Sequence, residues 1–596
     1  MTDSTVLPPD DAQAAAVVDD RPDEGALGAA RTADVLIDLL IEHGVEVIFG
    51  IPGGTIAPLY DALLDRPQVR VITTRHETGA MYAAAGYART TGKLGVVMVT
   101  SGPGVLNCFN GLASAYLEGL PVLLLAGEVP RKVQGRRALQ EGSSHNLNIV
   151  GMMRSITKLA FEIPESNAAP TMLQRGIATA LSGKKGPVAI TLPLDVTSAE
   201  IVPPEIAVDV HTTFTVSEKA VSRARYLLTR YPRVAIFVGA RVREGHGPQA
   251  LRAFAEHTQI PVMTTPRGKG VFPEDHPLAL GVFGMGGHPS SSDFLKEGLD
   301  VLLVLGTGLG DLATDGWSEL LQPKYGLIHV DLDAAHVGRT YATALSIAAP
   351  ADQFLDRLRE QMPAAAEQRT YGIRYYTDPE QLAVGDEGKI TPQRALWELQ
   401  QVLPADTIYA LDAGDHYGFA VHYIKSTSPD AFVAMTGMGS MGCAIGSAMG
   451  AKLAHPERTV VAICGDGGLA MQMGELLTIA TEKIDILVVV LNDGRFTMVE
   501  RGNVEALGRT PPYPTGPMSV LALGQALGLA ATRIARPGDM QQRLFAHAGA
   551  GPLVAEVDID ASVHMPKHGR GEQLARLARP VKPEKLHPQL RLVKVA

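Results

Sequence analysis

The stretch Val460-Val461-Ala462-Ile463-Cys464-Gly465-Asp466-Gly467-Gly468 joins an unbroken apolar run to a glycine-rich turn that holds one carboxylate. A short apolar run without alternating polar residues predicts a strand that is buried on both faces, as in a parallel sheet covered by helices. Similar runs precede it at residues 407–411 and follow it at residues 487–491. We therefore predict a doubly wound α/β domain over residues 390–565.

The same pattern occurs twice earlier in the chain. Apolar runs that alternate with helical patterns lie at residues 45–49, 95–99, 121–125 and 187–192, and again at 234–239, 301–306 and 327–331. A proline-rich stretch at 202–205 and a polar segment at 367–389 separate the series. We predict three doubly wound parallel-sheet domains, the first two at residues 29–200 and 215–365. A chain of 596 residues is long enough for several domains, because one hydrophobic core seldom exceeds about 300 residues.

The overall charge and hydropathy limit the partners of the chain. Its formal net charge of -10 disfavours nucleic-acid binding, because a phosphate backbone attracts clustered Lys and Arg. No apolar run reaches the roughly 20 residues that a membrane-spanning helix needs, and the N-terminus lacks the basic start and apolar core of a signal peptide. We expect a cytoplasmic protein that binds neither nucleic acid nor membrane.

The two ends of the chain carry opposite charges. Residues 1–28 include seven acidic residues and one arginine, with almost no large apolar side chains, so we expect a disordered acidic arm. Residues 566–596 carry eight Lys and Arg against two Glu. This basic C-terminal tail is either a solvated end or a lid that closes over an anionic substrate.

Two aspartates of the third domain stand at the ends of predicted strands. Asp466 and Asp493 each follow an apolar run, 27 residues apart. Open α/β sheets bind ligands at the carboxyl ends of their strands, so we expect both aspartates near one ligand. Carboxylates suit Mg²⁺, which often completes its shell with phosphate oxygens, and Gly465, Gly467 and Gly468 let the main chain approach a diphosphate. The alternative is two ordinary turns.

This spacing resembles the cofactor signature of thiamine diphosphate enzymes, in which Gly-Asp-Gly is followed after roughly 25 residues by an asparagine-rich turn. The resemblance extends from about residue 30 to residue 565. It implies that Mg²⁺ is bound by Asp466, Asp493 and the main-chain carbonyl of Arg495. Asp493 stands where the family often has asparagine, and its added charge should strengthen the bond to the metal.

A second family motif is Arg75-His76-Glu77. The resemblance implies that Glu77 hydrogen-bonds the pyrimidine ring of the cofactor. A carboxyl group shielded from water can share its proton with the ring and favour the imino tautomer, which then removes the thiazolium C2 proton. Taken without the other motifs, Glu77 is typical of an acid that stabilises the start of a helix.

Further segments complete the cofactor match. The stretch 436–442 resembles the family segment in which a bulky apolar residue holds the cofactor in its bent form. The resemblance implies this role for Met441, and it implies that the Gly439 carbonyl faces the aminopyrimidine. The alternative for Met441 is a methionine of the hydrophobic core. In the diphosphate-binding turn 412–416, the residues Gly414 and His416 match the family. The turn at residues 50–54, which includes Gly53, is a further cofactor-binding match of the first domain.

The diphosphate-binding turn also departs from the family, because Asp415 replaces a usual Gln. An unpaired acid beside a phosphate is repulsive. We therefore expect Asp415 to turn away from the cofactor or to pair with a cation.

Within the family, four segments are most similar to acetohydroxyacid (acetolactate) synthase catalytic subunits: 49–54, 75–77, 140–141 and 451–458. Three positions depart from that pattern. Leu139 replaces Phe, Gly502 replaces a Trp that shapes the acceptor pocket, and Gly308 replaces a flavin-contacting Arg. FAD is left open, because residues 284–288 and Asp331 still resemble the nucleotide-binding pattern whereas Gly308 argues against it.

The resemblance implies a carboligase that decarboxylates a 2-oxo acid such as pyruvate and couples the remaining fragment to a second carbonyl compound. Glu77 would relay protons, and Gln140 and Lys158 are candidates for substrate contact, with a structural role as the alternative. A simple 2-oxo acid decarboxylase and a catalytically silent regulatory relative stay open. Because the family builds its active site between the first domain of one subunit and the third of another, we expect a homodimer or homotetramer.

Overall fold

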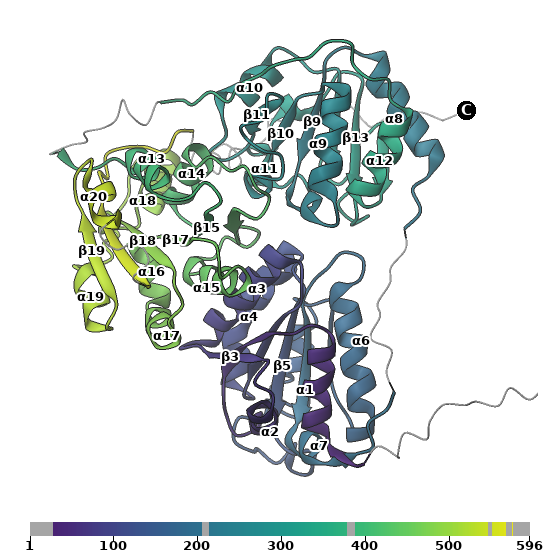
Figure 1. The fold of residues 1–596 in the computed structure, drawn as a ribbon, viewed down its shortest axis with the longest axis vertical. Coiled ribbons are helices and arrows are strands. Elements are labelled where there is room, and N and C mark those ends of the chain that lie inside the picture. The colour runs from purple at the N-terminus through teal and green to yellow at the C-terminus, as the bar shows by residue number, and fades with distance from the viewer. Residues whose placement is uncertain (1–27, 206–213, 378–387, 546–550, 568–574, 576–596) are drawn as a thin grey trace, which may run out of the picture.

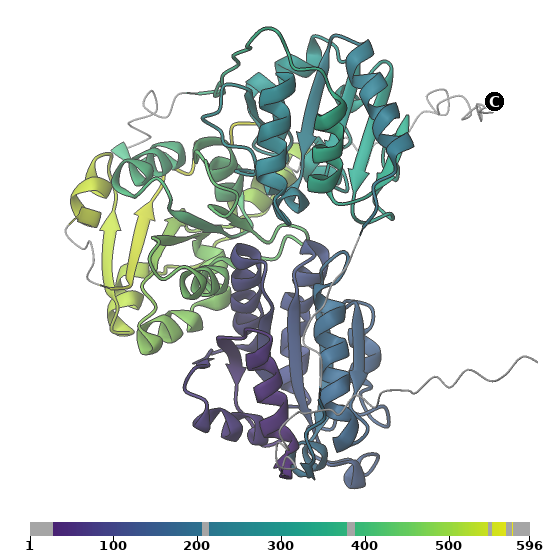
Figure 2. The ribbon, with the colours of Figure 1, turned by 45° about the vertical axis from the view of Figure 1, so that its right-hand side comes forward.

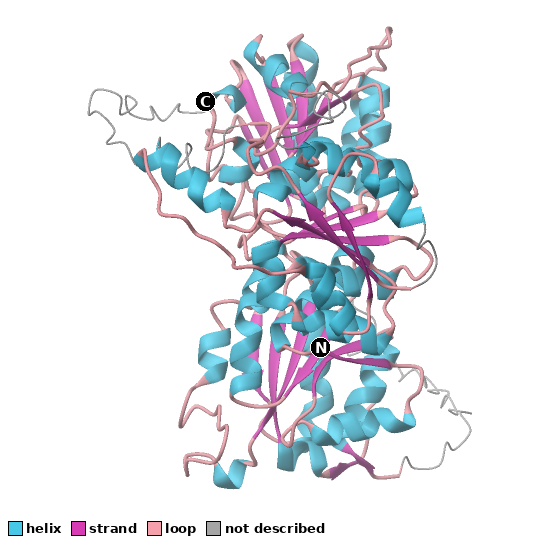
Figure 3. Cartoon of the chain, turned by 90° about the vertical axis from the view of Figure 1, so that its left-hand side faces the viewer, coloured by secondary structure: helices cyan, strands magenta, loops and turns pink. Residues whose placement is uncertain are grey.

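The computed structural model describes residues 28–205, 214–377, 388–545, 551–567 and 575. Within them, three six-stranded parallel sheets are each covered by helices on both faces, which confirms the predicted fold class (Figures 1 and 3). Among these residues no helix is long and apolar enough to cross a membrane. Residues 1–27 of the acidic arm predicted at 1–28, and the tail beyond residue 567 except residue 575, lie outside the described residues.

The first domain has the strand order β3-β2-β4-β5-β7-β6. Its strands are β2 (Val47–Ile51), β3 (Arg70–Thr73), β4 (Gly95–Val99), β5 (Val122–Glu128), β6 (Leu159–Glu162) and β7 (Val188–Pro193). Its helices are α1 (Thr32–Glu42), α2 (Ala57–Ala62), α3 (Glu77–Thr91), α4 (Pro103–Glu118), α5 (Ile149–Met153), α6 (Ala169–Leu181) and α7 (Leu194–Ser198). A short antiparallel pair of β1 (Ala30–Arg31) and β8 (Glu200–Ile201) joins the two ends of the domain.

The middle domain has the strand order β11-β10-β9-β12-β13-β14. Its strands are β9 (Val234–Val238), β10 (Val262–Thr264), β11 (Ala279–Val282), β12 (Val301–Leu305), β13 (Gly326–Asp331) and β14 (Leu345–Ala348). Its helices are α8 (Glu218–Arg230), α9 (Gly247–Thr258), α10 (Pro289–Lys296), α11 (Asp311–Thr314) and α12 (Ala351–Gln361). The central strands are buried along their whole length, as the apolar runs predicted.

The third domain has the strand order β16-β15-β17-β18-β20-β19. Its strands are β15 (Ile408–Leu411), β16 (Phe432–Ala434), β17 (Val460–Gly465), β18 (Leu487–Asn492), β19 (Ala530–Ile534) and β20 (Leu553–Asp558). Its helices are α13 (Pro392–Val402), α14 (Asp415–Tyr423), α15 (Ala444–Ala454), α16 (Asp466–Gln472), α17 (Gly474–Glu482), α18 (Thr497–Leu507), α19 (Val520–Ala526) and α20 (Asp539–Phe545). Figure 2 shows that this domain lies against both of the others.

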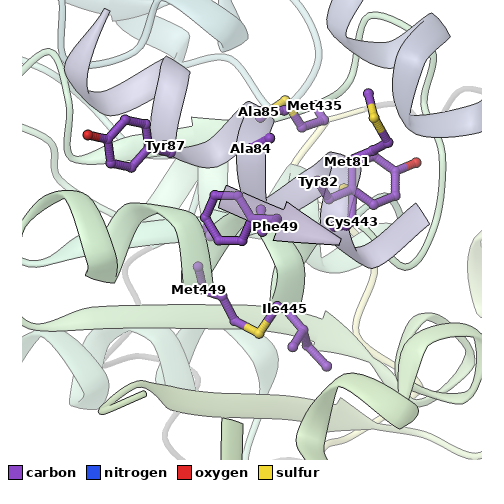
Figure 4. Close-up of a cluster of buried hydrophobic side chains, with 14 of the residues drawn as sticks. Phe49, Met81, Tyr82, Ala84, Ala85, Tyr87, Met435, Cys443, Ile445 and Met449 are labelled. Carbon is purple, nitrogen blue, oxygen red and sulfur yellow. The ribbon is translucent and has the colours of Figure 1, made fainter. Parts of the chain in front are cut away.

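The first and third domains share one hydrophobic core, in which α3 packs against α15. Figure 4 shows side chains of both helices, among them Tyr82 and Met449, gathered in this cluster with Phe49 of β2. The two backbones approach closely, because a Cβ atom at Gly450 would lie 1.9 Å from the Ala83 carbonyl oxygen. The contact therefore fixes the start of α3, which carries Glu77, relative to the third domain.

Candidate active site

A cavity of about 220 Å³ lies at the carboxyl end of the third sheet. The first strand of that sheet, β15, has β16 on one side and β17 on the other, so the loops after β15 and β17 diverge and leave a crevice between them. Ten of the predicted residues line this one cavity: Gly414, His416, Gly439, Met441, Gly465, Asp466, Gly467, Gly468, Asp493 and Arg495. Four separate loops of the sequence therefore meet where doubly wound sheets bind their ligands.

The two predicted metal-binding carboxylates line this cavity, with Asp466 buried and Asp493 partly buried. Burial raises the pKa of Asp493 to about 6, with a further contribution from the charge of Asp466. Burial also raises the pKa of Asp466, whose carboxylate accepts a hydrogen bond from Thr515. Thr497 donates to Asp493 over 2.5 Å. Burial and the repulsion between the two carboxylates both disfavour their ionised forms. A bound divalent cation would offset the burial and the repulsion, so the pair suits such an ion.

Other oxygen atoms would have to complete the metal shell. Among the residues that the structure describes, no group of three or more His, Cys, Asp or Glu side chains is arranged to hold a metal ion. Arg495 lines the cavity next to the two aspartates, so its carbonyl can serve as the predicted third protein ligand. This donor set of hard oxygens fits Mg²⁺, which is commonly bound by one or two carboxylates together with phosphate oxygens.

The diphosphate-binding turn presents a buried imidazole to the cavity. Burial lowers the pKa of His416 to about 4, and its Nε2 atom has no hydrogen-bond partner among the described residues. Buried polar atoms are nearly always hydrogen-bonded. An orphaned nitrogen in a cavity lined by glycine-rich loops is therefore typical of a group that contacts a polar ligand, and this fits a bound diphosphate.

The acidic residue of the same turn does pair with a cation, as predicted. Arg501 of α18 donates to the Asp415 carboxylate over 2.8 Å. Burial raises the pKa of Asp415, while the charge of Arg501 and its hydrogen bond lower it. The same guanidinium donates to the carbonyls of Ala561 and Val563. The ion pair thus neutralises the carboxylate beside the cavity and holds the segment that follows β20.

Met441 lies over the Gly-Asp-Gly turn. A Cβ atom at Gly467 would lie 3.3 Å from the Met441 methyl carbon and 2.4 Å from the ring of Phe496. Buried Asp412 holds the loop after Met441, because its carboxylate accepts hydrogen bonds from the main-chain N–H groups of Gly442 and Cys443 at 2.8 and 3.3 Å. The methionine is therefore part of the cavity wall, and its contact with the cofactor stays a prediction.

The predicted residues of the first domain lie together at the carboxyl end of their own sheet. Gly53 packs against Thr100, which follows β4. Glu77 begins α3 and accepts a hydrogen bond from Asn107 Nδ2 at 2.9 Å. The main chain of Gln140 packs on the turn after β4, at Gly102. All described residues that line the cavity belong instead to the middle and third domains, so the chain holds two separate halves of the predicted site.

Lys158 has a structural role, which was the alternative to substrate contact. Its Nζ atom donates to the main-chain carbonyls of Thr179 and Ser182, at 2.5 and 2.7 Å. Both carbonyls belong to the C-terminal end of α6, where a cation is favoured by the helix dipole and by unpaired carbonyl groups. The ammonium group is therefore committed to the fold and is not a substrate contact.

The middle-domain residues that resemble a nucleotide-binding pattern do not surround one open crevice. The Asp331 carboxylate is fully buried and ion-paired with Arg241, with His336 nearby at 3.7 Å. Met285 lines the cofactor cavity of the third domain. His288 stacks on His422 with 4.8 Å between the ring centres. A separate cavity of about 380 Å³ is lined by Gly306, Thr307 and Gly308, which follow β12, and by Arg241. FAD therefore stays a prediction.

Two residues that matter for the site were not predicted. Arg501 is the specific partner of Asp415, where the sequence indicated only that some cation was needed. Glu475 of α17 accepts hydrogen bonds from the main chain just before Glu77. The partners are 86 and 400 positions apart in sequence. No local pattern pairs residues so far apart, so neither contact had a signal in a single sequence.

Comparison with known proteins agrees with this geometry. Residues 30–148 match the N-terminal TPP binding domain of thiamine pyrophosphate enzymes, residues 221–358 the central domain, and residues 412–557 the C-terminal TPP binding domain. Thiamine pyrophosphate is another name for thiamine diphosphate. The three matches cover the three sheets in chain order.

Curated relatives extend over most of the chain. It is 32% identical to a probable acetolactate synthase large subunit of Methanocaldococcus jannaschii over 583 residues, which cover 93% of this chain and 96% of the relative. It is 34% identical to an acetolactate synthase of Arthrospira platensis, over 88% of this chain and 94% of the relative. The large subunit of acetolactate synthase isozyme 2 of Escherichia coli is 31% identical, over 89% and 95%. The chain therefore belongs to the thiamine pyrophosphate enzyme family.

Proposed function

We propose that this protein is a thiamine diphosphate and Mg²⁺ dependent carboligase of the acetolactate synthase type. It decarboxylates a 2-oxo acid such as pyruvate and couples the remaining two-carbon unit to the carbonyl group of a second substrate. The observation that carries the proposal is the convergence of ten predicted cofactor residues on one cavity at the switch point of the third sheet. The names of the relatives support the choice of reaction.

The residues of the cavity hold the cofactor rather than perform the bond changes themselves. Bound thiamine diphosphate supplies the carbon nucleophile and the electron sink that decarboxylation requires. Asp466, Asp493 and the Arg495 carbonyl would hold Mg²⁺, which would in turn bind the diphosphate. Met441 would support the bent form of the cofactor, and the Gly439 carbonyl would accept from its aminopyrimidine. Glu77 would hold a proton for the pyrimidine ring and pass it on during the cycle.

Glu77 reaches a cavity only if a second copy supplies it. The cavity is lined by the middle and third domains, whereas Glu77 lies at the edge of the first sheet. Large apolar side chains are exposed next to both halves of the site in the isolated chain: Leu106, Leu139, Met438, Met471, Met473 and Leu477. Exposed apolar groups of this kind mark protein–protein contacts. We propose a homo-oligomer whose minimal unit is a symmetric dimer with two sites.

The second carbonyl substrate decides between the synthase and a simple decarboxylase. We would incubate the purified protein with thiamine diphosphate, Mg²⁺ and ¹³C-labelled pyruvate, with and without a panel of aldehydes and 2-oxo acids, and identify the products by mass spectrometry. A labelled acetohydroxy acid or hydroxyketone is the expected product. Labelled acetaldehyde alone would replace the proposal by a decarboxylase, and an unchanged pyruvate pool would favour a catalytically silent relative.

A variant separates cofactor chemistry from background reactions. Glu77→Gln keeps the size of the side chain but removes its ability to hold and release a proton, so we expect product formation to fall by at least about 100-fold. Thiamine diphosphate should still bind, because the diphosphate and metal contacts belong to the third domain. Unchanged turnover of this variant would contradict the proposed role of Glu77.

A further inference from the structure

A carboxylate of the third domain holds the turn that leads into α3. Glu475 is the second residue of α17 and is fully buried. Its Oε1 atom accepts hydrogen bonds from the main-chain N–H groups of His76 at 2.9 Å and Arg75 at 3.2 Å. Gly79 provides the space for this contact, because a Cβ atom there would lie 2.2 Å from Glu475 Oε1.

The N-cap of α3 does not satisfy the N–H groups that Glu475 binds. His76 is the N-cap residue of α3, and its own imidazole accepts from the Thr78 N–H group. The N–H groups of Arg75 and His76 precede the helix, so they have no partner in its main-chain ladder. Glu475 satisfies both and places a negative charge at the positive end of α3.

The Glu475 carboxylate is itself fixed in place. Thr478 Oγ1 donates to its second oxygen over 2.7 Å. Burial raises the pKa of Glu475, while the hydrogen bonds from Thr478, Arg75 and His76 favour its ionised form. Arg75 adds a second tie between the same elements, because its guanidinium donates to Thr481 Oγ1 of α17 at 3.1 Å.

We propose that Glu475 is a positioning residue for Glu77. It fixes the Arg75–His76 turn and thereby the direction in which the next residue, Glu77, presents its carboxyl group. The inference rests on the catalytic role proposed above for Glu77. A shift of about 1 Å in a reacting group can lower a rate by about 100-fold, so a loosened turn would slow the reaction although no group that touches the cofactor has changed.

The position of Glu475 also joins the two halves of the site within one chain. Asp466 begins α16, and Glu475 follows nine residues later near the start of α17. The segment therefore runs from a proposed metal ligand in the cavity of one copy to the turn that carries Glu77, which in the proposed dimer serves the cavity of the other copy.

The test compares two buried glutamates that both join the first domain to the third. In Glu475→Gln the amide keeps the shape but loses the charge and one acceptor oxygen. The matched control for the turn is Glu118→Gln: Glu118 is also buried, and it lies at the end of α4, away from Glu77 in the sequence. It pairs with Arg267 and accepts a hydrogen bond from the Gly437 N–H group at 2.6 Å. Because Gly437 belongs to the segment that carries Gly439 and Met441, this control is read by hydrogen exchange alone. Thr478→Val is a milder variant, which removes only the hydrogen bond that orients Glu475.

Two readouts are needed. Hydrogen–deuterium exchange of the cofactor-free protein should show faster exchange of the amides at residues 75–80 in Glu475→Gln, by at least about 10-fold, and a smaller increase in Thr478→Val. In the loaded enzyme, kcat of Glu475→Gln should fall by about 10- to 100-fold, with half-saturation by thiamine diphosphate changed less than about threefold. Glu118→Gln should leave the exchange of this segment unchanged.

The outcomes separate this inference from the proposed function. Unchanged exchange and unchanged kcat in Glu475→Gln, alongside an inactive Glu77→Gln, would overturn the positioning role and leave the proposed function intact. An equal increase in the exchange of residues 75–80 in Glu118→Gln would also overturn it, because the effect would then be a general loosening of the domain contact. Full activity of Glu77→Gln would instead remove the proposed function on which the inference rests.

Discussion

The ion pair between Asp415 and Arg501 offers a quantitative test of the structure beside the cofactor cavity. The two charges are 2.8 Å apart and each side chain is 16% exposed. At an effective dielectric constant of about 20, their gross attraction is about 6 kcal/mol. Desolvation offsets most of that attraction, but removing one partner of a buried pair costs about 3–5 kcal/mol because a buried charge is left behind.

The two single substitutions should therefore differ. Arg501→Met leaves the Asp415 carboxylate unpaired and frees the carbonyls of Ala561 and Val563, so we expect the third domain to lose about 3 kcal/mol of stability. Asp415→Asn leaves Arg501 with both carbonyl partners and should cost about 1–2 kcal/mol. The double variant should lose less than the sum, because the unpaired carboxylate is then absent.

Tryptophan fluorescence can follow the third domain alone. The chain has two tryptophans, Trp317 between α11 and β13 of the middle domain and Trp397 in α13 of the third. In a Trp317→Phe background, urea unfolding detected through Trp397 would report the domain that holds the ion pair. Equal effects of the two single substitutions, or strict additivity in the double variant, would refute the reasoning that a buried carboxylate depends on Arg501.

Three further predictions concern the metal, the first-domain turn and the pH dependence. Asp493→Asn and Asp466→Asn should both raise the Mg²⁺ concentration at which thiamine diphosphate binding is half-maximal, and the increase for Asp466→Asn should be at least about 100-fold. Calorimetric titration would measure this concentration. An unaltered Mg²⁺ dependence would exclude the two aspartates as metal ligands. Gly53→Ala should destabilise the protein by about 1–3 kcal/mol, because its Cβ atom would lie 2.5 Å from Thr100 Cβ, whereas Gly54→Ala has open space and should be neutral in thermal unfolding. Burial lowers the pKa of His422 to about 4 from an ordinary 6.5. As the pH falls, the unfolded chain therefore takes up a proton before the folded chain does, and the free energy of unfolding should decrease by about 3 kcal/mol between pH 6.5 and pH 4. A free energy of unfolding that stays constant over this range would contradict a neutral, buried imidazole.

The central strands of all three sheets could be predicted from the sequence because they are buried on both faces. The apolar run at residues 95–99 matches β4 residue for residue, and the run at 301–306 differs from β12 by one residue. Edge strands such as β14 and β19 have four or five residues, of which only one in each strand is buried. Their apolar content is too low to distinguish them from loops, because their position comes from pairing with a neighbouring strand.

The cofactor half of the site was predictable for a related reason. Each of its loops follows a predictable strand, and the carboxyl ends of parallel strands must meet at one edge of the sheet. The partner contacts were not predictable, because Arg501 reaches Asp415 and Glu475 reaches the turn before Glu77 only through the folded arrangement. The ion pair of Asp331 with Arg241 likewise has no trace in the local sequence.

Complementation between two inactive variants tests the central claim most directly, namely that the cavity of one copy and Glu77 of another make one active site. Glu77→Gln and Asp466→Asn would be produced separately and together, and carboligation by the mixture would be measured. In mixed dimers one site carries both lesions and the other carries neither, so random assembly should restore about a quarter of the wild-type activity. If the two residues served the same site within one chain, every site would carry a lesion, and a mixture as inactive as its components would contradict the account.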